Sequence, residues 1–151
     1  MPLARVCSLV VVAALALAIA TPARPASGTS PACGVIGTLL TVGLLGQTHA
    51  DHHEIPTSKL RTGWPKFMTV AEASARGLDR STPDKAELAT RFRSLVDRLG
   101  RAGAALAAND IARFWTTIAQ AKPDTVAVSS LAKKTKLVCR DGHGSVTVSA
   151  P

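Results

Sequence analysis

Tyrosine is absent from this chain, and phenylalanine and tryptophan together make up only 3% of its 151 residues. Three cysteines are too few for a small domain that a disulfide framework holds together. Eleven glycines and nine prolines are too few for a collagen-like or low-complexity chain. Because 46% of the residues are hydrophobic, the chain can bury a core, and its length fits one small domain.

Sequence signatures of catalysis are lacking as well. The chain has no phosphate-binding glycine loop, no helical His-Glu-x-x-His zinc site and no paired zinc-knuckle cysteines. Cys139, Asp141 and His143 lie close together, but they supply a cysteine and a histidine where a structural zinc needs four ligands, and no oxyanion donor accompanies them. We therefore predict no catalytic residues, no cofactor apart from the metal considered below, and a protein that is not an enzyme.

The N-terminus has the pattern of a secretory leader. Arg5 precedes an apolar stretch, Val6 to Ala20, that ends in Ala18-Ile19-Ala20. A basic start, a short apolar core and a small-x-small ending are typical of a signal peptide, whereas a membrane-spanning helix needs about 20 apolar residues. We predict a signal peptide at residues 1–20 and a secreted or periplasmic protein. A leader that is not cleaved and anchors the chain in a membrane is the alternative.

A second apolar run, Cys33 to Gly46, contains no charge and four glycines. It is short for a membrane span, and its glycines lower its helix propensity. One interpretation is a buried helix or strand of the mature fold. A second makes residues 21–50 part of a composite leader that is cut after Ala50. A third is a segment that inserts into a membrane or binds a hydrophobic partner.

The chain is basic, with 18 Lys and Arg against ten Asp and Glu. Every acidic residue lies at or beyond Asp51, so cleavage after Ala20 leaves a net charge of +7, from 17 basic and ten acidic residues, and cleavage after Ala50 leaves +6. A basic exported protein readily binds anionic lipids, cell-wall polymers or acidic proteins. We therefore predict an anionic envelope component or a protein as the partner.

Two cysteines remain after cleavage at Ala20, because Cys7 leaves with the leader. In an oxidising compartment Cys33 and Cys139 are expected to form a disulfide. Two buried, unpaired cysteines are the alternative interpretation.

Helical signals dominate the middle of the chain. Residues 51–68 contain Pro56, Gly63 and Pro65, which predict a linker or loop. Thr69 and Glu72 match a capping box that opens a short helix ending by Gly77, and Thr82-Pro83-Asp84 predicts the start of the next helix. That helix has an apolar stripe formed by Leu88, Phe92, Leu95, Val96, Leu99 and Leu106, and a second stripe, shifted in phase after Asn109 and Asp110, is formed by Ile111, Phe114, Trp115 and Ile118. Two amphipathic helices that pack on each other are predicted.

Beyond Lys122-Pro123 the apolar residues alternate with polar ones. Val126 with Val128, Leu137 with Cys139, and Val146 with Val148 show the period of strands, and Asp141-Gly142-His143-Gly144 predicts a tight turn. The predicted fold class is α+β: a signal peptide, then a small helical hairpin or bundle, then an antiparallel β-hairpin or meander. The α+β domain is expected over residues 69–151.

A cluster of histidines and acids follows the second apolar run. His49, His52 and His53, with Asp51 and Glu54 between and beside them, are residue types that bind Cu²⁺, Ni²⁺ or Zn²⁺. Cleavage after Ala50 would create an amino terminus with histidine at the third position, which can hold Cu²⁺ or Ni²⁺ in a square plane. A solvated polar linker is the competing interpretation.

One short pattern concerns nucleic acid. Thr69–Ala73 with Gly77–Thr82 loosely resembles the helix-turn-helix of excisionase-type DNA-binding proteins. Pro83 interrupts the position of the recognition helix, which such proteins insert into the major groove. We therefore do not expect nucleic acid as a partner.

These observations predict a non-enzymatic, exported, basic module that binds an anionic envelope component or a protein. Metal handling through His49, His52 and His53 is one alternative, and a membrane-active protein that uses Cys33–Gly46 is the other. The predicted binding surface consists of Arg91, Arg98, Arg101, Phe92, Phe114 and Trp115. Packing of the three aromatic side chains in the core is the competing interpretation.

Overall fold

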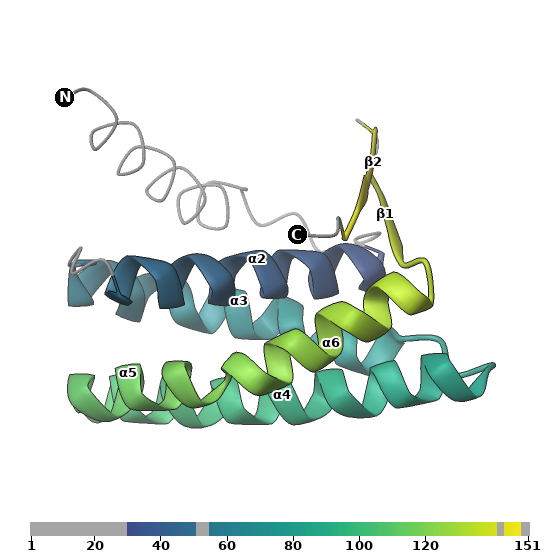
Figure 1. Cartoon of the computed structure of the whole chain (residues 1–151). Helices are drawn as coiled ribbons and strands as arrows, with labels where there is room; N and C mark the ends of the chain where they lie inside the picture. The colour runs from purple at the N-terminus through teal and green to yellow at the C-terminus, as the bar shows by residue number, and fades with distance from the viewer. Residues whose placement is uncertain (1–29, 51–54, 142–143, 149–151) are drawn as a thin grey trace, which may run out of the picture.

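The computed structural model describes residues 30–50, 55–141 and 144–148, which form five α-helices and then one two-stranded antiparallel sheet (Figure 1). The predicted order of helices first and a β-hairpin last is confirmed, and the protein is mostly helical. The predicted leader, residues 1–20, lies outside the described residues. The elements are α2 (Pro31–Ala50), α3 (Thr57–Gly77), α4 (Pro83–Ala107), α5 (Ile111–Gln120), α6 (Lys122–Lys134), β1 (Val138–Asp141) and β2 (Gly144–Thr147).

The helices pack antiparallel, as in a four-helix bundle. Gly77 at the end of α3 lies against Pro31 at the start of α2, and Trp64 in α3 lies against Gly103 near the end of α4. Only Ala121 separates α5 from α6, so these two helices together take the place of the fourth helix of the bundle. They contact both α4 and α2. The arrangement follows the up-down-up-down order of four-helix bundles, with short connections between neighbours (Figure 1).

The second apolar run forms α2, in agreement with the interpretation that it is a buried helix of the mature fold. Val35, Val42 and Leu45 belong to the hydrophobic core and are nearly inaccessible to solvent. The hydroxyl groups of Thr38 and Thr48 donate to the carbonyl oxygens of Gly34 and Leu44, which satisfies these buried polar groups within the helix. The core therefore depends on α2.

The predicted linker over residues 51–68 is wrong from Thr57 onward, because these residues form the first half of α3. Pro65 lies on the exposed side of the helix, where the loss of one backbone hydrogen bond is tolerated. Leu60, Trp64 and Met68 point into the core at a spacing of four. Burial of these large side chains offsets the cost of the proline, and the predicted capping box at Thr69 lies inside the helix.

The two predicted amphipathic helices are α4 and α5. The hydroxyl of Thr82 accepts a hydrogen bond from the amide of Lys85 and caps α4, and the carboxylate of Asp110 accepts one from the amide of Arg113 and caps α5. All residues of the first predicted stripe are buried: Leu88, Phe92, Leu95, Val96, Leu99 and Leu106. The phase shift between the stripes corresponds to the chain turn at residues 108–110.

The predicted strand around Val126 and Val128 is wrong, because both residues lie in α6. Pro123 occupies the first turn of this helix and Asp124 adds an acid there, which is the same starting signal as at Thr82-Pro83-Asp84. Val128 is buried on the core side and Val126 is 59% exposed. A three-stranded meander is therefore not formed within the described residues.

The C-terminal hairpin agrees with the prediction. β1 and β2 pair antiparallel, with Cys139 opposite Val146 and Asp141 opposite Gly144. This register leaves residues 142 and 143 as the connection, at the position of the predicted turn. The hairpin packs on the first turns of α2 and brings the C-terminal strands to the start of the described chain.

Candidate functional site

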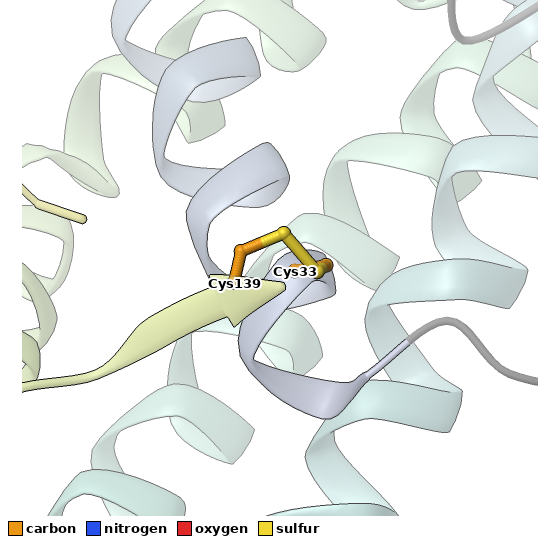
Figure 2. Close-up of a disulfide and its surroundings, with 2 residues drawn as sticks. All are labelled: Cys33 and Cys139. Atoms are coloured by element: carbon orange, nitrogen blue, oxygen red, sulfur yellow. A yellow bond between two sulfur atoms is a disulfide. The ribbon is translucent and has the colours of Figure 1, made fainter. Parts of the chain in front are cut away.

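A disulfide joins Cys33 in the first turn of α2 to Cys139 in β1 (Figure 2). The two cysteines are 106 residues apart in the sequence, and the bond fastens the hairpin to the bundle. The predicted pairing is thus found, and Cys139 carries no free thiol to act as a nucleophile. His143, which we considered beside it, lies outside the described residues. A disulfide of this kind is compatible with export.

Two of the predicted binding aromatics are core residues. Phe92 and Phe114 are fully buried, so neither side chain can contact a partner while the bundle is intact. Trp115 is half-buried and stacks on the ring of His49, with the ring centroids 4.5 Å apart and the planes nearly parallel. Neighbouring helices cover the apolar stripes, so Phe92 and Phe114 belong to the core and not to a binding surface.

The three predicted arginines have different surroundings. Arg98 Nε donates to Asp124 Oδ2 over 2.7 Å, and both side chains are largely shielded, so this pair connects α4 to α6. Arg91 Nε lies 3.9 Å from Glu87 Oε1 at the exposed surface. Arg101 is exposed and makes no ion pair with the described residues. Arg101 is therefore the arginine of the three that is available to a ligand.

Two further ion pairs, near the N-terminal end of α4, shift the pKa of one of their partners. The side-chain hydrogen bond from Lys85 lowers the pKa of Asp79 to about 2. Because this pKa lies below its ordinary value, the pair favours the folded state at neutral pH, and its contribution is lost as the pH falls through this low pKa. The hydrogen bond to Asp84, 2.8 Å long, raises the pKa of Lys134 and joins α6 to α4.

Aromatic rings form a continuous cluster between α2, α3 and α5. Trp64 contacts Phe67 and Phe114, with ring centroids about 5 Å apart, and Phe114 in turn contacts Trp115. The stack of Trp115 on His49 extends the cluster to α2. The cluster connects three helices and fills one end of the bundle, and edge-to-face pairs of this kind add to the energy of burial.

Close packing against Trp64 predicts a large difference between two glycines of α4. A Cβ at Gly103 would lie 2.6 Å from Trp64 Nε1 and 2.7 Å from Cδ1, whereas a Cβ at Gly100 would meet only Met68 Cε at 3.9 Å. We expect Gly103→Ala to lower the free energy of unfolding by about 1–2 kcal/mol, because the indole cannot shift without disturbing its aromatic neighbours. Gly100→Ala is expected to raise it by about 0.5–1 kcal/mol, because alanine is the better helix former.

Urea unfolding followed by tryptophan fluorescence measures both variants. Equal stability of Gly103→Ala and Gly100→Ala would show that the helices do not approach this closely.

The predicted metal site is only partly described. His49 lies at the last turn of α2 against Trp115, while His52 and His53 lie outside the described residues. Within the part of the chain that the structure describes, no three His, Cys, Asp or Glu side chains come together in a way that could hold a metal. Metal binding at His49, His52 and His53 therefore stays a prediction.

Arg61 is a structural residue that the sequence analysis missed. Its Nε donates to the carbonyl oxygen of Leu106 over 3.3 Å, and its Nη2 donates to the side chain of Asn109, which has a positive φ of 64°. The guanidinium thereby satisfies groups at the C-terminal end of α4. These contacts span more than 40 residues of sequence, so no local signal points to them.

The described chain carries many exposed positive charges. It holds 16 Lys and Arg residues, of which four form ion pairs: Lys85, Arg91, Arg98 and Lys134. Of the remaining twelve, all but Lys133 are exposed. A ligand with several negative charges can therefore approach basic side chains that no described acid neutralises.

Among the described residues, α2 is the one helix that is long and apolar enough to cross a membrane, although its burial in the bundle is also that of a core helix. The chain matches no protein-family model, no curated protein and no solved structure.

Proposed function

We propose that this protein is an exported, non-enzymatic module that binds an anionic component of the cell envelope. The observation that carries the proposal is the set of twelve Lys and Arg side chains outside ion pairs in the described chain, eleven of them exposed. The disulfide between Cys33 and Cys139 supports an oxidising location.

Most of the polar side chains buried in the described part of the chain form hydrogen bonds within their own helices. The polar side chains buried in the described part are three threonines and a serine, and Thr38, Thr48 and Thr117 each donate to the carbonyl oxygen four residues earlier in their own helix. These hydroxyls serve helix geometry.

The position of α2 supports cleavage before Pro31 rather than after Ala50. Removal of residues up to 50 would take away Cys33 and the core residues Val35, Val42 and Leu45. A chain processed in that way would lose the disulfide and expose the apolar sides of α3, α5 and α6.

Binding to a soluble polyanion tests the proposal. Inorganic polyphosphate and an envelope fraction of the exporting host are titrated with the exported protein at low and at physiological salt. We expect complexes that weaken at least about ten-fold as the salt screens the charges, and no binding to neutral dextran. A protein that stays unbound by both polyphosphate and the envelope fraction at low salt would contradict the proposed function.

A further inference from the structure

The outward side of α2 is a helix face without charge. α2 contains no Lys, Arg, Asp or Glu, and only 44% of its most apolar 18-residue window is buried. Leu40 is 60% exposed, and Leu44 beside it is half-buried. The exposed residues Gly37 and Gln47 continue this row at helical spacing, so the four residues share one side of the helix. We call these residues, 37, 40, 44 and 47, the α2 face.

Exposed lysines border the α2 face on the side of α3. α3 approaches α2 at Val70, since a Cβ at Gly34 would lie 3.5 Å from the Val70 carbonyl oxygen. Lys66 and Lys59 precede Val70 by four and eleven residues, which places them on the same side of α3. Both lysines are exposed, and Val70 itself is 45% exposed.

A second basic row borders the α2 face on the side of α6. α6 turns Asp124 and Lys134 toward α4, where they form ion pairs with Arg98 and Asp84. Lys122, Val126 and Lys133 are spaced at four and seven residues on a different side of the helix, away from α4. Since α6 also packs on α2, this row belongs to the outer side of a helix that neighbours α2.

The acidic side chains whose surroundings the structure describes lie away from the α2 face. Five of the seven acidic side chains whose surroundings are described belong to α4 or to the turns at its ends: Asp79, Asp84, Glu87, Asp97 and Asp110. Asp124 faces α4, and Glu72 is two residues from Val70 and therefore on the opposite side of α3. Among these described side chains, the α2 face and its two lysine rows thus form an acid-free surface.

We infer that this surface docks on an anionic lipid bilayer, with the α2 face, Val70 and Val126 in the interfacial layer and the lysines on the lipid phosphates. The inference rests on the proposed function and names its partner. An apolar helix face flanked by lysines is the arrangement by which peripheral proteins bind anionic membranes. A second copy of this chain fits the surface less well, because face-to-face contact would bring the lysine rows of both copies together and their positive charges would repel.

The chain upstream of α2 also favours a membrane. The apolar stretch predicted to direct export ends at Ala20, and α2 begins at Pro31. The ten residues between them span at most about 36 Å when fully extended. α2 is therefore the first helix of the bundle to emerge beside the bilayer during export.

Vesicle cosedimentation with matched charge variants tests the inference. The exported protein, with its N-terminus sequenced, is mixed with vesicles of phosphatidylglycerol and phosphatidylcholine in equal parts, and with vesicles of phosphatidylcholine alone. We expect binding to the anionic vesicles only. Lys66→Gln with Lys122→Gln should weaken it about 25-fold, since each basic residue near the surface contributes about five-fold.

The matched control is Arg80→Gln with Arg93→Gln, which removes the same charge from exposed positions in α4 and in the turn before it, and which should change binding less than about two-fold. Leu40→Gln, which alters an exposed side chain and leaves the core intact, should weaken binding several-fold even at high salt.

The possible failures are distinguishable from one another. Equal losses in the two charge pairs would overturn the docking surface, and so would a dimer in sedimentation velocity that Leu40→Gln converts to monomer. Binding to polyphosphate without binding to anionic vesicles would overturn the inference and leave the proposed function standing. Failure to bind vesicles, polyphosphate and the envelope fraction would contradict both.

Discussion

Replacing Cys33 and Cys139 together by serine is expected to lower the free energy of unfolding by about 4–5 kcal/mol. The disulfide closes a loop between residues 106 apart, and the restriction of the unfolded chain grows with loop length. The bond also holds the β-hairpin on the N-terminal end of α2, where β1 packs. For a domain of this size such a loss is a large part of the total stability.

Urea unfolding of the double variant and of the oxidised and reduced parent protein measures this effect. The reduced parent should unfold at the same urea concentration as the double variant, which separates loss of the bond from any effect of serine. An oxidised parent that unfolds together with its reduced form would show that the bond contributes nothing to stability, or that it does not form.

Truncation of Phe114 to alanine is expected to cost about 3–5 kcal/mol. Its side chain is fully buried and contacts both Trp64 and Trp115, so alanine would leave a cavity in the middle of the aromatic cluster. Phe114→Leu keeps most of the volume and should cost less than about 1.5 kcal/mol.

Unfolding of both variants and their binding to polyphosphate are measured together. A folded Phe114→Ala protein should bind as tightly as the parent, because a core residue touches no ligand. If Phe114→Ala kept its stability and lost polyphosphate binding, the residue would belong to a binding surface, as the sequence alone had suggested.

Helices with a broad apolar stripe and a capped N-terminus could be predicted from the sequence. α4 is bounded by Thr82 and by the turn before Asp110, and each signal is local, so it can be recognised without the rest of the fold. The Cys33–Cys139 pair could be predicted because only these two cysteines remain once Cys7 is assigned to the leader.

The first half of α3 was missed because Pro65 was interpreted as part of a linker, and α6 was missed because its apolar residues were interpreted as a strand. Leu60, Trp64 and Met68 have the spacing of a buried helix side, and this signal outweighs Pro65. At Pro123 the same proline-acid pair that opens α4 opens α6, but alternating valines nearby suggested a strand. A local sequence pattern that fits both a helix and a strand does not show which of the two tertiary packing stabilises.

The candidate site was harder to predict than the fold. An amphipathic stripe shows which side of a helix is apolar, but it does not show what covers that side, so Phe92 and Phe114 could be assigned to a surface. The stack of Trp115 on His49 and the contact of Arg61 with Asn109 depend on how helices are placed in space. Such contacts have no signature in the neighbouring sequence.

The covalent link between α2 and β1 has a mechanical consequence. The antiparallel helices bring the C-terminal strands back to the end of the bundle where α2 begins. Tension applied between residue 30 and β2 therefore passes directly through the disulfide between Cys33 and Cys139. The 105 residues that lie between the two cysteines carry none of that load. A bundle tethered upstream and pulled from its other terminus would therefore keep its helices folded for as long as the thiols stay oxidised.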